Sequence, residues 1–319
     1  MMMIRYSIIR LTWMLFILVF VITLVYYTTR FAQMNAWSLG FRHMSFTEKF
    51  SLVTDDFLKY IQAIFSSWDW GNTRRGQDVW ELFSDRLPIS LRLNIYAFLI
   101  YFPLGILLGT VSAVKKDSII DYMISIPTFI MSSIPTFIWI FLFIMLFGYT
   151  LGWLPPRPPS VEEGSWMMFK GYIMPVAALA LVPMAKFTSM LRGELLESFS
   201  SDYLLLLKTK GLNRRQAIFR HLLKDSMIPI IPEIVPTFIF VLISSFFVEI
   251  IYNMQGISAL LFNALYDPFM DTNIINIDTP PAVMVSTFYT FIALFMAFVV
   301  DITFAFVDPR IKMGSKKAE

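Results

Sequence analysis

The chain has 319 residues, a formal net charge of +3 and a mean hydropathy of +0.64, with 57% hydrophobic and 15% charged residues. A soluble protein of this length lacks the interior volume to bury so many apolar side chains, so the composition excludes a soluble globular domain and indicates a membrane protein. The chain has no cysteine, which excludes disulfides, thiolate metal ligands and a thiol nucleophile.

Six apolar stretches are long enough to cross a bilayer as helices, which requires about 20 residues each. In chain order they are residues 11–29, 93–114, 122–147, 171–191, 226–248 and 283–307. The first could be a signal peptide, but its apolar run exceeds the usual length of about 7–15 residues and no small-x-small cleavage site follows, so we expect a retained span. The sequence therefore predicts an all-α integral membrane protein with about six transmembrane helices.

These spans divide the chain into four parts. Residues 1–29 form a cytoplasmic stub and the first span, and residues 30–92 form an extracytoplasmic segment. The last part of that segment, residues 78–92, has the pattern of a short amphipathic helix. Residues 93–308 form a transmembrane domain of five spans, and residues 309–319 form a cytoplasmic tail.

The distribution of Lys and Arg predicts the orientation. Six spans place both termini on one side, and that side also holds Lys115, Lys116 and the basic segment 192–225. The short loops on the other side hold only Arg157 and Lys170. Because cytoplasmic loops are enriched in Lys and Arg, both termini are predicted to be cytoplasmic.

Residues 202–229 are the most informative stretch, because they read as a basic helix–Gly–helix between two membrane-length segments. Ser201 or Asp202 can cap the first helix, and Gly211 suits the left-handed residue that ends a helix. Asn213 can cap the second helix, with Gln216 three residues later in a capping-box arrangement. The second helix would carry an apolar stripe of Ile218, Phe219, Leu222 and Leu223 beside basic residues. Such a helix could lie on anionic lipid or fit a groove in a partner protein, and the sharp glycine turn favours the partner.

Several motifs in and around this segment match a known family. In the loop they are Asp202-Tyr203, Lys210-Gly211-Leu212, Arg220-His221-Leu222-Leu223 and Pro229; elsewhere they are Ser133-Ile134-Pro135, Gly152-Trp153-Leu154-Pro155, Val248-Glu249, Gly256 and Asp308-Pro309-Arg310-Ile311. With these motifs, residues 1–30 and 78–312 resemble ABC-importer permeases of the dipeptide/oligopeptide branch, of the B-subunit type. One departure is that the Glu-Ala-Ala positions of the family's cytoplasmic loop read Leu205-Leu206-Leu207.

The resemblance implies a type I ABC importer permease, a non-catalytic subunit that moves di- or oligopeptides across the bacterial plasma membrane. It implies a second homologous permease, two cytoplasmic ATPase subunits, an extracytoplasmic peptide-binding lipoprotein and membrane lipid as partners, and no nucleic acid. The residues expected to couple the loop to the ATPases are Asp202, Tyr203, Lys210, Gly211, Asn213, Arg214, Arg215, Ile218, Phe219, Arg220, His221 and Leu222.

The sequence predicts neither a cofactor nor a metal site. It lacks a G-x-x-x-x-G-K-[ST] phosphate loop, so ATP hydrolysis is expected in a partner. Its two histidines, His43 and His221, are predicted to lie on opposite sides of the membrane.

Charged residues near or inside spans are candidates for function because an unpaired charge in the bilayer is costly. Glu233 and Glu249 are candidates for the translocation path or a gate, with a surface position at the level of the headgroups as the alternative for Glu249. Lys186 and Asp301 are expected to reach toward the membrane surface or to pair with each other.

Two alternatives to a peptide permease remain open. The first is a permease of the same family for a nickel chelate, glutathione or another small solute. The second is an ion-coupled secondary transporter or channel, against which stand the groove-fitting loop and the lack of an intramembrane Asp/Glu/His relay. A membrane enzyme would need a nucleophile–base pair or a metal set that the sequence does not offer.

Overall fold

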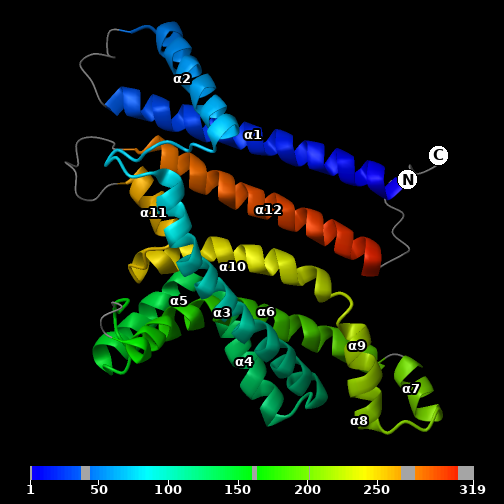
Figure 1. Ribbon diagram of the computed structural model, residues 1–319. Helices are drawn as coiled ribbons and strands as arrows, with labels where there is room; N and C mark the ends of the chain where they lie inside the picture. Colours follow the sequence, from blue (N-terminus) through cyan, green and yellow to red (C-terminus); the bar gives the residue numbers. More distant parts are fainter. Residues whose placement is uncertain (1, 37–43, 160–163, 201, 267–276, 308–319) are drawn as a thin grey trace. The chain divides into compact units, whose positions relative to one another are not determined.

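The computed structural model describes residues 2–36, 44–159, 164–200, 202–266 and 277–307 (Figure 1). Within these ranges the chain is helical, with no β-strand beyond one isolated bridge between Asn72 and Asp78. The prediction of an all-α membrane protein is confirmed for this part of the chain.

Five helices contain a stretch long and apolar enough to cross a membrane. They are α1 (Met2–Ala36), α3 (Val79–Val114), α6 (Ser165–Ser200), α10 (Ile231–Ile251) and α12 (Thr279–Val307). Four of them cover a predicted span and extend beyond it at one or both ends, whereas α10 begins five residues after the start of the predicted span 226–248 and ends three residues beyond it. Further helices are α2 (Phe46–Ser67), α7 (Asp202–Thr209), α8 (Arg214–Ala217), the π-helical η3 (Ile218–Leu222), α9 (Leu223–Ser226) and α11 (Ile257–Leu265).

The third predicted span, residues 122–147, is broken rather than continuous. It consists of α4 (Ile119–Ser133) and α5 (Thr136–Phe143), which continues into the π-helical η1 (Ile144–Thr150), and the two parts are bent by 105°. The break falls at Ile134, which has extended backbone angles (φ −103°, ψ 124°). A residue before proline is driven out of the helical region by the proline ring, so Pro135 explains the break.

The described residues form two compact units, one from residues 2–91 and 254–298 and the other from residues 92–253 and 299–307. The predicted transmembrane domain, residues 93–308, therefore includes parts of both units. In the first unit, α1, α2, α11 and parts of α3 and α12 supply a buried apolar cluster that includes Ile22, Val53, Phe83, Ile257 and Val283.

Two features of the first unit differ from the sequence-based expectation. The predicted amphipathic helix of residues 78–92 is not separate, because α3 runs without a break from Val79. The sequence analysis also missed α2, whose start is fixed by a capping box between Ser45 and Glu48. The hydrogen bonds that Glu48 accepts from Ser45 lower the pKa of its carboxyl.

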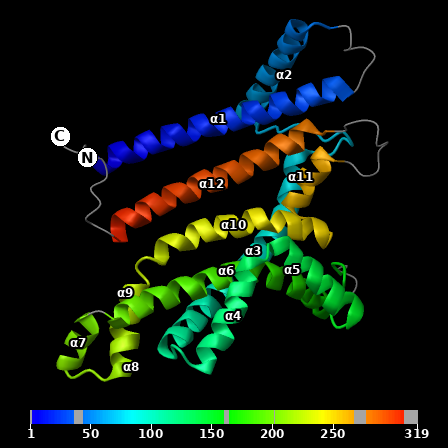
Figure 2. The ribbon, with the colours of Figure 1, turned by 180° about the vertical axis from the view of Figure 1, so that it is seen from behind.

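In the second unit, α6 is the helix on which the others pack: α4, α5, α7, α9 and α10 all contact it (Figures 1 and 2). Two glycines bring α3 close to it. A Cβ atom on Gly105 would lie 2.8 Å from Cβ of Phe187, and one on Gly109 would lie 2.8 Å from the carbonyl oxygen of Thr188. Since small residues four apart let helix backbones approach closely, these glycines determine the α3–α6 contact.

Candidate functional site

The segment between α6 and α10 begins with α7, and a glycine ends that helix. Gly211 has a φ of +82°, a left-handed conformation that glycine adopts at least cost. The N–H of Leu212 donates to the carbonyl of Leu207 at 3.3 Å, the hydrogen bond that closes a Schellman turn. A Cβ on Gly211 would meet no atom within 4 Å, so the requirement for glycine is conformational rather than steric. The predicted glycine turn is confirmed.

The second helix of the loop is capped as the sequence predicts. The Asn213 side chain accepts from the N–H of Gln216 at 2.8 Å, and the Gln216 side chain accepts from the N–H of Asn213 at 3.2 Å. The helix then runs through α8, η3 and α9 to Ser226, with a π-helical turn in its middle. This reciprocal cap satisfies two N–H groups that a helix start would otherwise leave without partners.

The loop is fastened to the rest of its unit at both ends. The helices α7 and α9 both contact α6 (Figure 1). The hydroxyls of Ser198 in α6 and Ser226 in α9 are 3.2 Å apart. Within the loop, Ile218 and Leu222 are buried, whereas Phe219 is 54% exposed. The predicted apolar stripe therefore does not form one continuous face. Ile218 and Leu222 pack inside the loop, whereas the ring of Phe219 is exposed.

The outward side of the loop is basic. We call four exposed residues in the first part of its second helix, Arg214, Arg215, Phe219 and Arg220, the loop face. Asp202 and Lys210 are exposed as well, His221 is half-buried, and the side chain of Tyr203 lies outside the described residues. The family's Glu-Ala-Ala positions present the exposed Leu205 and Leu206 and the buried Leu207.

Glu233, one of the two predicted path residues, pairs with a lysine of the same unit. Lys186 Nζ in α6 is 2.7 Å from Glu233 Oε2 in α10 and donates to Thr237 Oγ1 at 3.1 Å. The structure thus gives Lys186 a different partner from the Asp301 that the sequence suggested. The pairing compensates the charge of Glu233 within the chain.

Glu249, the other predicted path residue, is completely buried in α10. Ser245 Oγ donates to Glu249 Oε1 at 3.5 Å, one turn earlier on the same helix. Glu249 is therefore enclosed within its unit rather than exposed on the surface of that unit.

An ion pair that the sequence did not predict lies at the start of the broken span. Arg192 in α6 donates to both carboxylate oxygens of Asp121 in α4, with Nε–Oδ1 and Nη2–Oδ2 distances of 2.9 and 2.8 Å. Asp121 is 2% exposed and also accepts from the hydroxyls of Ser112 and Ser125 and from the N–H of Asp117. This carboxylate is fully hydrogen-bonded, which a buried charge requires.

One sequence signal could have located this ion pair. Asp121, Ser125, Thr128 and Ser132 are polar residues spaced by four, three and four positions in an apolar segment. That spacing places them on one face of a helix. In the structure this polar face of α4 meets α6, and we call the contact the α4–α6 seam.

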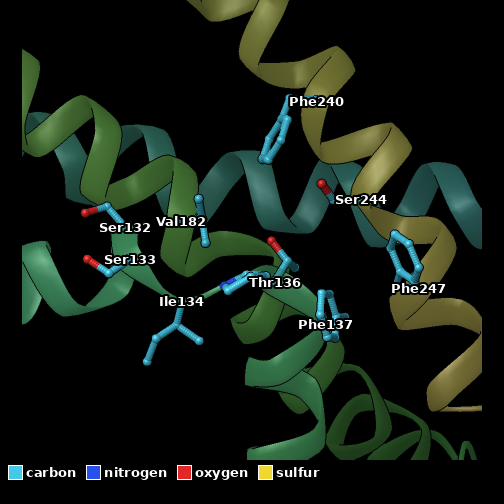
Figure 3. A pocket seen from close by; sticks show the side chains of 10 residues that line it. Ser132, Ser133, Ile134, Thr136, Phe137, Val182, Phe240, Ser244 and Phe247 are labelled. Carbon is cyan, nitrogen blue, oxygen red and sulfur yellow. The ribbon is translucent and has the colours of Figure 1, made fainter.

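Two cavities adjoin the α4–α6 seam. The seam cavity, of about 180 Å³, is lined by Ser125, Thr128, Phe129, Ser132, Thr188, Ser189 and Arg192. The broken-span cavity, of about 350 Å³, is lined by Ser132, Ser133, Ile134, Pro135, Thr136, Phe137, Val182, Phe240, Ser244 and Phe247. Figure 3 shows Ser132 and Ser133 on one side of the broken-span cavity and Phe240, Ser244 and Phe247 of α10 on the other. Ser132 borders both cavities.

Nothing in the described part of the chain offers a metal centre, since no three His, Asp or Glu side chains gather there. The molecule instead combines apolar spans, a polar seam with cavities inside one unit, and a rigid basic loop outside the spans. These features are those of a membrane transport subunit.

Comparison with known proteins identifies the family. The chain belongs to the binding-protein-dependent transport system inner membrane component family, whose model matches residues 105–313. It is 32% identical over 238 residues to a dipeptide transport system permease protein of Lactococcus lactis, covering 74% of this chain and 73% of the relative. It is 27% identical over 266 residues to an oligopeptide transport system permease protein of Salmonella typhimurium, covering 82% and 81%.

A solved structure shares the fold. A crystal structure of an amino acid ABC transporter with histidines superimposes with a TM-score of 0.51 at 17% identity, over 70% of this chain and 92% of the other. The fold predicted from the sequence, that of a type I ABC importer permease, is therefore confirmed. The chain is a transport component located in a membrane.

Proposed function

We propose that this chain is a permease subunit that imports di- or oligopeptides across a bacterial plasma membrane, driven by ATP hydrolysis in separate subunits. The substrate class is supported by the names of the relatives, which are dipeptide and oligopeptide permeases matched over most of their length. The chain's own sequence lacks a phosphate-binding loop, so the energy must come from a partner.

The observation that carries the proposal is the doubly fastened loop. Closure of an ATPase dimer can reposition the spans only if the element between them transmits the movement. A loop that swivelled would contribute no free-energy difference between the two states of the permease. The Gly211 turn, the Asn213 cap and the Ser198–Ser226 contact make this loop stiff and join it to α6.

The residues of the loop take two roles in this proposal. The loop face contacts the ATPase, with Phe219 inserting into an apolar groove and the arginines meeting acidic groups around it. Asp202, Tyr203, Lys210 and His221 lie at the edges of that contact. Gly211, Asn213, Ile218 and Leu222 set the shape of the loop.

The proposed assembly contains this chain, a second homologous permease, two ATPase subunits and an extracytoplasmic peptide-binding lipoprotein. The excess of Lys and Arg on the side of the termini supports a cytoplasmic position for both termini and for the loop. Within the spans, the buried Glu249 is proposed to act at the interface with the second permease or at a gate, and the Glu233–Lys186 pair to join α6 to α10 near the path.

The test is peptide uptake by the complete importer in proteoliposomes, measured together with ATP hydrolysis. Phe219→Ala should reduce uptake per ATP hydrolysed several-fold while the assembled complex remains in the membrane. Lys224→Gln is the matched control, because Lys224 is an exposed cation of the same helix outside the loop face. Uptake without nucleotide and driven by an ion gradient would refute the proposal in favour of a secondary transporter.

A further inference from the structure

We propose that the α4–α6 seam binds the main chain of the translocating peptide, by presenting a row of hydrogen-bond acceptors to its N–H groups. This inference rests on the proposed function, because it takes the substrate to be a peptide. It goes beyond that function by naming the part of the substrate that is recognised and the side chains that recognise it.

The seam hydroxyls act as acceptors because their protons are already used. Thr128 Oγ1 donates to the carbonyl of Ile124 at 2.7 Å, and Ser132 Oγ donates to the carbonyl of Phe129 at 2.9 Å. On the facing helix, Thr188 Oγ1 donates to the carbonyl of Met184 at 2.8 Å. A hydroxyl has one proton and two lone pairs, so each of these oxygens can offer the seam cavity only lone pairs. Such a wall binds N–H donors.

The charges at one end of the cavity do not favour an ion. Arg192 lines the seam cavity, but its positive charge is matched by the bidentate contact with Asp121. The cavity is therefore polar with a compensated charge. This environment suits the amide groups of a peptide better than a metal ion or a free anion, which would need an uncompensated opposite charge.

The spacing of the hydroxyls fits an extended peptide. Thr128 and Ser132 are four residues apart on α4, which corresponds to about 6 Å along the helix axis. In an extended chain, N–H groups that face the same side recur every second residue, at about 6.5–7 Å. Two successive N–H groups on one side of an extended peptide can therefore reach Thr128 and Ser132 together.

The broken-span cavity has room for a side chain of the same peptide. It adjoins the seam cavity at Ser132 and is walled by Phe137, Phe240 and Phe247 (Figure 3). Its volume of about 350 Å³ is within the range of ligand pockets, about 300–1,000 Å³. Aromatic walls accept apolar side chains with little selectivity. A path that binds the peptide main chain through hydrogen bonds and accepts different side chains in the broken-span cavity would transport peptides of varied sequence.

A labelling experiment tests whether the peptide occupies the seam. The chain has no cysteine, so the single substitutions Ser132→Cys and Ser189→Cys place a thiol in the seam cavity without background. Ile130→Cys is the matched control, because Ile130 is 46% exposed and lies on the opposite face of α4. In the complete importer turning over with ATP, a transported dipeptide should slow the reaction of a methanethiosulfonate reagent at positions 132 and 189 several-fold, and leave position 130 unchanged. Equal rates with and without peptide would overturn the inference.

A thermodynamic cycle tests the hydrogen bond itself. A tetrapeptide with a methyl group on the peptide nitrogen of its second residue lacks one of the two same-side N–H groups, so the wild-type importer should transport it with a kcat/KM that is lower by about 2- to 10-fold, the worth of one hydrogen bond. The substitution Thr128→Val keeps the shape of the side chain and removes its oxygen. In this variant the ratio of kcat/KM for the unmethylated peptide to kcat/KM for the methylated peptide should move toward one. Ile130→Val should preserve it. Because the same binding protein delivers both peptides to every variant, its own preference cancels.

The outcomes separate this inference from the proposed function. If the wild-type importer takes up neither peptide, the proposed function is wrong. If it takes up peptides but shows neither protection of positions 132 and 189 nor a changed ratio in Thr128→Val, the function stands and the seam is not the peptide track.

Discussion

The loop between α6 and α10 and the α4–α6 seam are both polar regions in a largely apolar chain, but they are specified differently. The loop is defined by residues close together in sequence, such as Gly211, Asn213 and Gln216. The seam is closed by Asp121 and Arg192, which lie on separate helices, α4 and α6, with most of the broken span between them in the sequence. Residues that are close in sequence set the local backbone conformation of the loop, whereas residues that are distant in sequence join two helices at the seam. The two regions should therefore respond differently to mutation.

The largest effect is expected when one partner of the seam ion pair is removed. Arg192→Met leaves Asp121 buried without its counter-charge, and breaking a buried pair in this way costs about 3–5 kcal/mol. The midpoint of thermal unfolding of the purified protein should fall strongly. The double variant Asp121→Leu with Arg192→Met should recover most of the loss, since it removes both charges. If the single variant unfolds at the wild-type temperature, the pair does not join α4 to α6.

A smaller effect is expected where α3 meets α6. Gly109→Ala would place a methyl group 2.8 Å from the carbonyl oxygen of Thr188, and such overpacking costs about 1–3 kcal/mol. Gly193→Ala is the control, because a Cβ there meets nothing within 4 Å and the helix gains from alanine. Thermal unfolding should show a loss for the first variant and none for the second. Equal behaviour would argue against close packing at Gly109.

In the loop, the glycine turn should matter for transport more than for global stability. Gly211→Val forces a branched side chain into a left-handed conformation, at a cost of about 1–2 kcal/mol that falls on the loop alone. Peptide uptake should drop while the unfolding temperature of the spans changes little. Gly211→Asn should retain more uptake, because asparagine tolerates that conformation. Uptake that is indifferent to both substitutions would contradict a shaped loop.

The smallest effect is expected at the second cap. Asn213→Ala removes the acceptor for the Gln216 N–H, which typically costs about 1 kcal/mol. Asn213→Ser keeps an acceptor and should behave like the wild type. The comparison can be read from hydrogen exchange at the start of α8, where the alanine variant alone should exchange faster.

The same difference between local and distant determinants explains what the sequence could predict. The length of the apolar stretches predicted the spans, and Gly211 and Asn213 predicted the turn and the cap of the loop. Pro135 was visible, but whether a span with a proline bends or stays helical depends on its neighbours, and Pro127 indeed remains inside α4. The sequence suggested the membrane surface or Asp301 for Lys186, and only the packing of α6 on α10 selects Glu233.

The candidate site was predicted in the same uneven way. The sequence identified Phe219 and the arginines but placed Phe219 in one stripe with Ile218 and Leu222, because a helical wheel cannot say how wide the buried stripe is. Only the contacts with α6 and α7 show that the ring faces outward. The sequence did not predict a role for the hydroxyls of the seam, because serine and threonine are common in membrane helices. Only their position beside the seam cavity distinguishes them from other such residues.

The central claim is that the loop carries movement from an ATPase to the spans, and cross-linking at its outward ring tests it most directly. In the otherwise cysteine-free chain, Phe219→Cys should cross-link to an ATPase subunit in the native membrane, whereas Ile130→Cys should not. The account predicts a cross-link whose yield changes when ATP is bound. Modification of position 219 by a membrane-impermeant reagent from outside intact cells, with no cross-link to the ATPase, would contradict it.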